Sequence, residues 1–221
     1  MNNFFLLLGD EIRGFIKSKI MLALWIGMPV LMILLYFINP DTEGIPLTLF
    51  SGIIISSIGG LLAAVILSTT IVNEKNNNVY DLFLIRPVKR WNILLAKYMA
   101  VIICLTIATI LSFAVGLVID SFTNALPSGA VLLQFLESIV MAVAAMSISC
   151  VMGILIGLLV KSVALAAILA IYLGQQLSVV AVLPTIFVPS VSSYVFSIGI
   201  GLTVTILVLI IDMIIFSKKQ F

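Results

Sequence analysis

Residues 73–97 read NEKNNNVYDLFLIRPVKRWNILLAK, and this stretch decides how the rest of the chain is arranged. It is the longest polar interruption in a chain that is otherwise almost continuously apolar. Two acids, Glu74 and Asp81, lie in its first third. It also holds five of the chain's 11 lysines and arginines, namely Lys75, Arg86, Lys89, Arg90 and Lys97. Long apolar runs flank it on both sides, so the stretch predicts a polar connection between two membrane-spanning segments.

The composition supports this interpretation. The chain has 221 residues, of which 63% are hydrophobic and only 9% are charged, whereas soluble domains have about 45–50% apolar and about 25% charged residues. Apolar runs of about 20 residues match the thickness of a bilayer as helices. The strands of a membrane barrel would alternate between apolar and polar residues, and the sequence has no such alternation. The predicted fold class is therefore an all-α polytopic membrane protein.

Several classes of function are excluded at this stage. The chain has no histidine, the commonest metal ligand and general base, so we expect neither a metal site nor a catalytic site. The two cysteines, Cys104 and Cys150, lie within apolar runs and are expected to be small buried side chains. A net charge of +2 gives no reason to expect nucleic-acid binding. No GxxxxGK[ST] phosphate loop is present, and the N-terminus does not resemble a cleaved signal peptide.

The apolar runs predict six spans within a single transmembrane domain, residues 1–221. Residues 1–19 precede them and predict an amphipathic helix in the membrane interface. Residues 184–194, PTIFVPSVSSY, are too short to cross a bilayer and predict a re-entrant or interfacial segment. The predicted spans are residues 20–38, 49–72, 93–119, 131–160, 162–183 and 195–216.

Two details of this map predict contacts. The apolar stripe of the first helix is expected to contain Phe4, Leu8, Ile12, Phe15 and Ile16, with Asp10, Arg13 and Lys17 on another face. Gly153 and Gly157 form a GxxxG pattern on the fourth span, which predicts either a packing seam within the chain or a dimer seam.

The positions of the basic residues give the orientation. Three precede the first span, five lie in or beside the loop between spans two and three, one (Lys161) lies between spans four and five, and two follow span six. All 11 therefore fall on one side, while the other loops contain no base. By the positive-inside rule this side is the cytoplasm, and both termini are cytoplasmic.

Local signals divide the stretch itself. Asn73 is expected to be the N-cap of a short helix, and the three asparagines at 76–78 predict a turn because asparagine tolerates left-handed backbone. A second short helix is expected from Val79 and must stop before Pro87. A loop that only orients the chain is one interpretation. The apolar residues of VYDLFLI, however, require cover from the membrane interface or from another protein.

This pattern resembles the cytoplasmic loop of ABC-transporter permeases of the type-2 export class. Glu74 matches the leading acid, Asp81-Leu82 the acid-Leu pair, Pro87-Val88 the Pro-Val pair, Lys89-Arg90 the basic pair, and Lys97 the final lysine. Asn78-Val79 stands where that family usually has Gly-Thr, a position that asparagine can occupy with positive φ. The interfacial helix, six spans and re-entrant segment are also similar to the family's architecture.

The resemblance implies a function. In such permeases a short cytoplasmic helix couples to a separate P-loop ATP-binding subunit, which holds ATP and Mg; this chain would bind no cofactor and hydrolyse no ATP. Six spans are half a transporter, so a second permease copy is also implied. ATP-driven closure of the partner subunits would switch the two halves between inward- and outward-facing states. The residues implied in coupling are Glu74, Val79, Asp81, Leu82, Phe83, Pro87 and Arg90.

Polar residues within the spans are candidates for the transport path. Gln175 and Gln176 lie in the fifth span, and adjacent positions point about 100° apart, so one can face a cavity. Glu137 is a further candidate, with exposure at the outer interface as the alternative. Asp212 is expected to pair with Lys218 or Lys219. The few charges in the spans favour a hydrophobic, lipid-like or peptide cargo.

Three other classes remain for comparison. An ATP-independent channel or secondary transporter would be expected to have deep charges or matching halves. An intramembrane enzyme would need a histidine, a paired-acid site or an activated nucleophile. A non-transporting, permease-like sensor or assembly subunit is compatible with the sequence.

Overall fold

The computed structural model describes residues 4–38, 47–80, 90–123, 129–178 and 193–218. This part of the chain is helical and contains no strand. Five of its helices are long and apolar enough to cross a membrane, which confirms a polytopic helical membrane protein. The helices are α1 (Phe4–Lys17), α2 (Lys19–Ile38), α3 (Leu47–Asn76), α5 (Arg90–Thr123), α6 (Gly129–Leu159), α7 (Val163–Ser178) and α9 (Ser193–Lys218).

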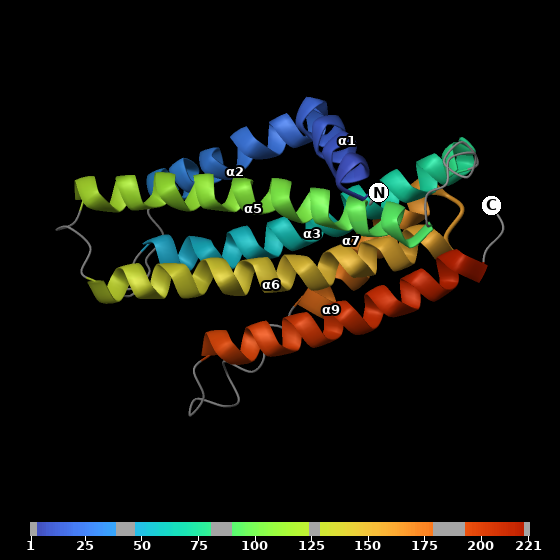
Figure 1. Ribbon diagram of the computed structural model, residues 1–221. Coiled ribbons are helices and arrows are strands. Elements are labelled where there is room, and N and C mark those ends of the chain that lie inside the picture. Colours follow the sequence, from blue (N-terminus) through green and yellow to red (C-terminus); the bar gives the residue numbers. More distant parts are fainter. Residues whose placement is uncertain (1–3, 39–46, 81–89, 124–128, 179–192, 219–221) are drawn as a thin grey trace.

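Helix α3 is central to the bundle. It packs most extensively against α6 and α7, and it also contacts α5 and α2 (Figure 1). Helices α1, α2 and α5 form one side of the bundle, and α9 covers α6 on the opposite side. The end of α3 that precedes residue 77, the start of α5, helix α1 and the last turn of α9 lie at the same end of the bundle. We call it the basic end, because Lys75 and Lys218 lie in the last turns of α3 and α9, and Lys97 and Lys161 contact the end of α3.

The contact between α3 and α6 is close because α6 carries glycines where it crosses α3. A Cβ atom added to Gly153 would lie 2.5 Å from the carbonyl oxygen of Ala64. A Cβ atom on Gly157 would lie 2.9 Å from Cβ of Ile71. Small residues allow two backbones to approach in this way. The predicted GxxxG seam is therefore used for packing within the chain.

Helix α1 is amphipathic as predicted, and its polar positions Asp10, Arg13 and Lys17 are exposed. Its apolar face packs against α5 through Leu7 and Phe15, which join the main hydrophobic core. Ile16 was expected in the same stripe but is 40% exposed. The buried stripe of α1 thus includes Leu7 rather than Ile16, because α1 packs against α5.

Helices α7 and α5 correspond to the fifth and third predicted spans. Helix α7, which corresponds to the fifth span, has 16 described residues and is a shorter apolar helix. Residues 179–192, which include most of the expected re-entrant segment, lie outside the described residues. Helix α5 continues to Thr123, four residues beyond the predicted end of the third span at residue 119.

The prediction that Asn73 caps a new helix is wrong, because α3 continues without a break to Asn76. Glu74 and Lys75 lie in its last turn, where side-chain contacts described below hold the helical backbone in place. The turn expected at the asparagines is confirmed: Asn77 and Asn78 follow the helix, and Asn78 has a φ of 54°. Asparagine is one of the few residues that occupy this left-handed region readily.

Candidate coupling site at the basic end of the bundle

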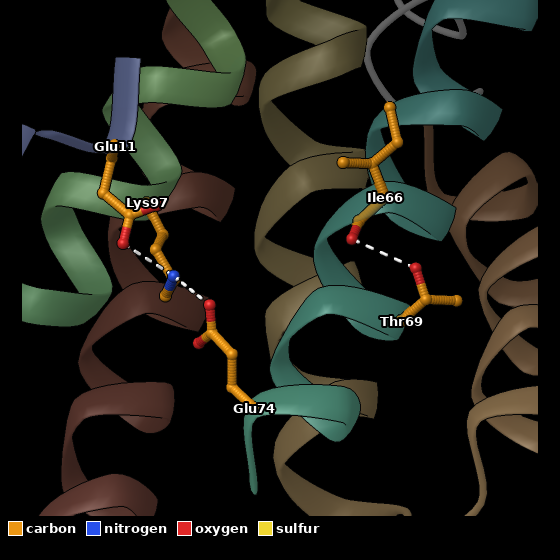
Figure 2. A network of polar contacts seen from close by, with 5 residues as sticks. All are labelled: Glu11, Ile66, Thr69, Glu74 and Lys97. Atoms are coloured by element: carbon orange, nitrogen blue, oxygen red, sulfur yellow. Dashed lines mark hydrogen bonds and ion pairs between the residues drawn. The ribbon is translucent and has the colours of Figure 1, made fainter. Parts of the chain in front are cut away.

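A buried lysine forms the centre of the basic end. Lys97 lies on α5, six residues after the exposed Trp91, and its side chain is 2% exposed. Its Nζ atom lies 2.7 Å from Oε1 of Glu11 on α1 and 2.6 Å from Oε1 of Glu74 on α3 (Figure 2). One ammonium group therefore joins three helices, α1, α3 and α5.

The charges in this site depend on one another. An ammonium group that is buried without a partner costs several kcal/mol, and a buried pair repays this cost only with good geometry. Here two carboxylates surround one lysine, and each carboxylate side chain keeps about a fifth of its surface exposed, 19% for Glu11 and 20% for Glu74. The lysine is thus buried more deeply than the two carboxylates that pair with it.

Glu74 is the first charged residue of the polar stretch at 73–97, and Lys97 is the last. The structure shows that these two ends of the pattern bind each other across 23 residues. The polar stretch is therefore closed into a loop by its own terminal charges. This contact explains physically why the pattern needs an acid at one end and a lysine at the other.

Sequence reasoning missed Glu11. Its place on α1 holds the signal that could have found it: Glu11 lies four residues after Leu7 and four before Phe15, the two residues that pack into the core. A carboxylate in line with a buried stripe requires a cation on the neighbouring helix. Burial raises the pKa of Glu11 above its ordinary value, although the charge of Lys97 acts in the opposite direction.

A tyrosine extends the site toward α9. Tyr80 is 3% exposed, and its ring makes an edge-to-face contact with Phe216 in the last turns of α9, with centroids 5.3 Å apart. Burial and the nearby charge of Glu74 raise the pKa of the Tyr80 hydroxyl, so this group stays neutral. The start of the segment after the asparagine turn is therefore packed against α9.

Lys75 and Asn76 point to the other side of α3. Nζ of Lys75 lies 3.2 Å from the carbonyl oxygen of Gly157 and 3.3 Å from that of Leu158, and it also contacts the carbonyl oxygen of Val160. Nδ2 of Asn76 donates a 3.1 Å hydrogen bond to the carbonyl oxygen of Lys161. The last turn of α3 is thus bonded to the end of α6 and to the α6–α7 turn (residues 160–162).

The other residues predicted for coupling are placed only in part. Val79 is half-buried, and Val79 and Tyr80 are helical as expected. Asp81, Leu82, Phe83 and Pro87 lie outside the described residues. Arg90 is the first residue of α5.

The structure places the predicted path residues only in part. Gln176 is exposed and Glu137 is half-buried, and the structure describes only the backbone position of Gln175 on α7. A pocket of about 250 Å³ lies between α6 and α9, and its lining includes Ile139, Ser147 and Gly201 but neither Gln176 nor Glu137.

Asp212 differs from its prediction. It is fully buried on α9, and its carboxylate oxygens have no hydrogen-bond partner among the described residues. The expected pair with Lys218 is not formed, because Lys218 is exposed while Asp212 faces the core beside Leu209 and Phe216. Lys219 lies outside the described residues.

The described part of the chain contains no cluster of histidine, cysteine, aspartate or glutamate that could hold a metal ion. Both cysteines are buried, as the sequence predicted, and they form no disulfide with each other.

Comparison with known proteins completes the description of the site. A search of curated proteins gave no match. Residues 10–176, about three quarters of the chain, match the model of a family described as ABC-2 family transporter protein. This range contains Glu11, Glu74 and Lys97 and ends within α7. The chain belongs to the ABC-2 family of transporter proteins and is a membrane component of an ABC transporter.

Proposed function

We propose that this chain is the membrane-spanning half of an exporter that a separate P-loop ATP-binding subunit drives by alternating access. The observation that carries the proposal is the Glu74–Lys97–Glu11 site. It joins α1, α3 and α5 at the basic end, next to the start of the proposed coupling segment. A force applied to that stretch reaches three helices through one buried cation.

The segment that receives the force is Val79–Ile85. In the proposal it docks into a groove of the ATP-binding subunit, and Asp81, Leu82, Phe83, Pro87 and Arg90 contribute to the contact. ATP and Mg are held by the partner, and the permease responds to closure of two such subunits. The family membership supports this arrangement, because an ABC-2 permease works with an ATP-binding subunit.

The proposal includes a topology in the cell membrane. The chain is a single transmembrane domain, α1 lies in the cytoplasmic interface, and six spans include α7 together with the residues that follow it. A re-entrant segment precedes α9. The lysines at the basic end of the bundle, Lys75, Lys97, Lys161 and Lys218, support cytoplasmic termini by the positive-inside rule. A second permease copy completes the transporter, and Gln175, Gln176 and Glu137 are the candidates for the transport path.

Association with the ATPase tests the proposal. The permease is co-expressed with the P-loop ATPase that we expect the neighbouring gene to encode, and it is purified in detergent through a tag on the permease. Leu82→Asp and Phe83→Asp place a carboxylate in the proposed docking helix, and we expect each to abolish co-purification of the ATPase. The wild-type permease alone should hydrolyse no ATP.

Asn77→Asp is the matched control, because it adds the same charge at an exposed neighbouring position. It should leave co-purification unchanged. Retention of the ATPase by both Leu82→Asp and Phe83→Asp would contradict the docking segment. Robust ATP hydrolysis by the permease alone would contradict the assignment of ATP chemistry to a partner.

A further inference from the structure

Three consecutive residues end α3 and bind two different parts of the bundle. Glu74 binds Lys97 toward α1 and α5. Lys75 and Asn76 bind the end of α6 and the α6–α7 turn on the opposite side. The proposed coupling segment begins directly after this divergence, at Val79.

Lys75 contacts the C-terminal end of α6, where a cation is favourable. The last carbonyl groups of an α-helix have no partner within the helix, and the helix dipole places partial negative charge there. A lysine amine that bonds to the carbonyl oxygens of Gly157, Leu158 and Val160 satisfies these groups and complements that charge. Lys75 therefore caps the C-terminus of α6 from a neighbouring helix.

Close backbone packing continues from this cap along α3. Gly157 faces the side chain of Ile71 and the carbonyl oxygen of Ser68, and a Cβ atom added to Gly157 would lie 2.9 Å from Cβ of Ile71 and 3.0 Å from that oxygen. Oγ of Ser68 also lies 3.5 Å from the carbonyl oxygen of Ala166, one turn into α7. The end of α3, the end of α6 and the start of α7 thus share one densely bonded region.

We infer that Lys75 is a positioning residue that makes the end of α3 and the α6–α7 turn move as one body, so that displacement of the coupling segment reaches α7 directly. The inference rests on the proposed function for the origin of the displacement. The cap itself is a property of the permease alone.

Spin labels can measure the cap in the full chain. Asn77 and Ser162 are exposed and flank the Lys75 contact, so both are changed to cysteine and labelled. The native Cys104 and Cys150 are buried, which protects them from the label. The dipolar interaction between the labels is recorded by EPR in lipid nanodiscs, with and without the ATPase, and with and without ATP and vanadate. The variants are Lys75→Met, Lys75→Arg and, as the matched control, the exposed Lys17→Met.

In the wild-type background the dipolar interaction should be strong and unchanged by ATP. Lys75→Met should weaken it in the permease alone, and ATP should weaken it further in the complex. Lys75→Arg keeps the cation and should restore the wild-type spectrum, and Lys17→Met should match the wild type.

Either of two results overturns the inference: equal spectra for wild type and Lys75→Met, or an ATP-dependent change in the wild type itself. If Lys75→Met does not fold, the ATP response of the wild type still decides. Failure of the proposed function is separate, because the wild type would then bind no ATPase, while the comparison of Lys75→Met with wild type in the permease alone would still test the cap.

Discussion

Helix α3 is held by two different kinds of contact. At the basic end it is held by charge, through Lys97 and two carboxylates. Near its middle it is held by shape, where Gly153 of α6 meets the backbone of Ala64. Between helices in a membrane there is little hydrophobic gain, so close packing must replace it. In the charged contact each group depends on its partner, because removing the lysine or the carboxylates leaves the opposite charge largely buried without a counter-ion. The packed contact has no such dependence.

The largest expected effect comes from breaking the charged contact. Lys97→Met keeps the length of the side chain but leaves Glu11 and Glu74 without their cation. Breaking a buried pair by removing one partner typically costs about 3–5 kcal/mol, and we expect a loss of this size in the free energy of unfolding. Reversible unfolding in mixed detergent micelles measures it.

Lys17→Met is the control for Lys97→Met, because Lys17 ends α1 and is exposed. Its effect should stay within about 0.5 kcal/mol, as for ordinary surface substitutions. Equal effects of the two variants would show that the charged contact adds nothing to the fold.

The second prediction breaks the packed contact. Gly153→Ala places a methyl group 2.5 Å from the carbonyl oxygen and 2.8 Å from Cα of Ala64. Backbone atoms cannot turn aside, so the helices must separate, and overpacking of this kind costs about 1–3 kcal/mol. The same unfolding assay measures the loss.

Gly199→Ala on α9 is the matched control, since a Cβ there meets nothing within 4 Å. It should be neutral or slightly stabilising, because alanine favours helix over glycine by up to about 1 kcal/mol. If Gly153→Ala also stabilises the protein, the close approach of α3 and α6 is contradicted.

These two contacts differ in how far the sequence predicted them. The glycine pair predicted a seam, but its partner on α3 depends on how two helices cross, which spacing within one helix does not contain. Glu74 and Lys97 were identified as ends of one pattern, yet nothing in the pattern gives the distance between them. Glu11 was missed because the apolar stripe of α1 was expected to include Ile16 rather than to centre on Leu7.

Lys75 is a second residue whose contact with a neighbouring helix the sequence did not predict. Its basic charge was sufficient to predict the orientation of the chain, so nothing in the sequence required a second role. The cap on α6 arises only because α3 and α6 end at the same level. Conversely, the asparagine turn was predictable because it depends on local backbone preference alone.

The third prediction concerns Glu11, one of the two acids in the charged contact. Burial raises the pKa of Glu11 above its ordinary value of 4.5, so its protonated form is favoured by folding. Relative to Glu11→Gln, which cannot titrate, the wild type should therefore be most stable below pH 4.5 and lose stability as the pH rises through the raised pKa. In Glu11→Gln the side-chain oxygen can still accept the hydrogen bond from Lys97. The difference in the free energy of unfolding between this variant and the wild type should therefore be about 0.5–1.5 kcal/mol.

Unfolding of Glu11→Gln and wild type across a pH series measures this difference. Asp10→Asn is the control, because Asp10 neighbours Glu11 but is exposed. A wild type that gains stability over Glu11→Gln as the pH rises would show that attraction to Lys97 outweighs the cost of burial.

The smallest effect is expected where helices are joined by neutral hydroxyls. Oγ of Ser147 on α6 lies 2.6 Å from the hydroxyl of Tyr98 on α5 and 3.0 Å from Oγ1 of Thr205 on α9. Hydrogen bonds between membrane helices contribute about 0.6 kcal/mol on average, so Thr205→Val, which removes the bond to Ser147, should cost about that amount. Thr203→Val is the control, since within the described part of the chain the Thr203 hydroxyl bonds to carbonyls of its own helix. A loss near that of Lys97→Met would mean that these hydroxyls join α5, α6 and α9 as strongly as the charged contact joins α1, α3 and α5; no loss would mean that the hydroxyls add nothing measurable to the packing of the bundle.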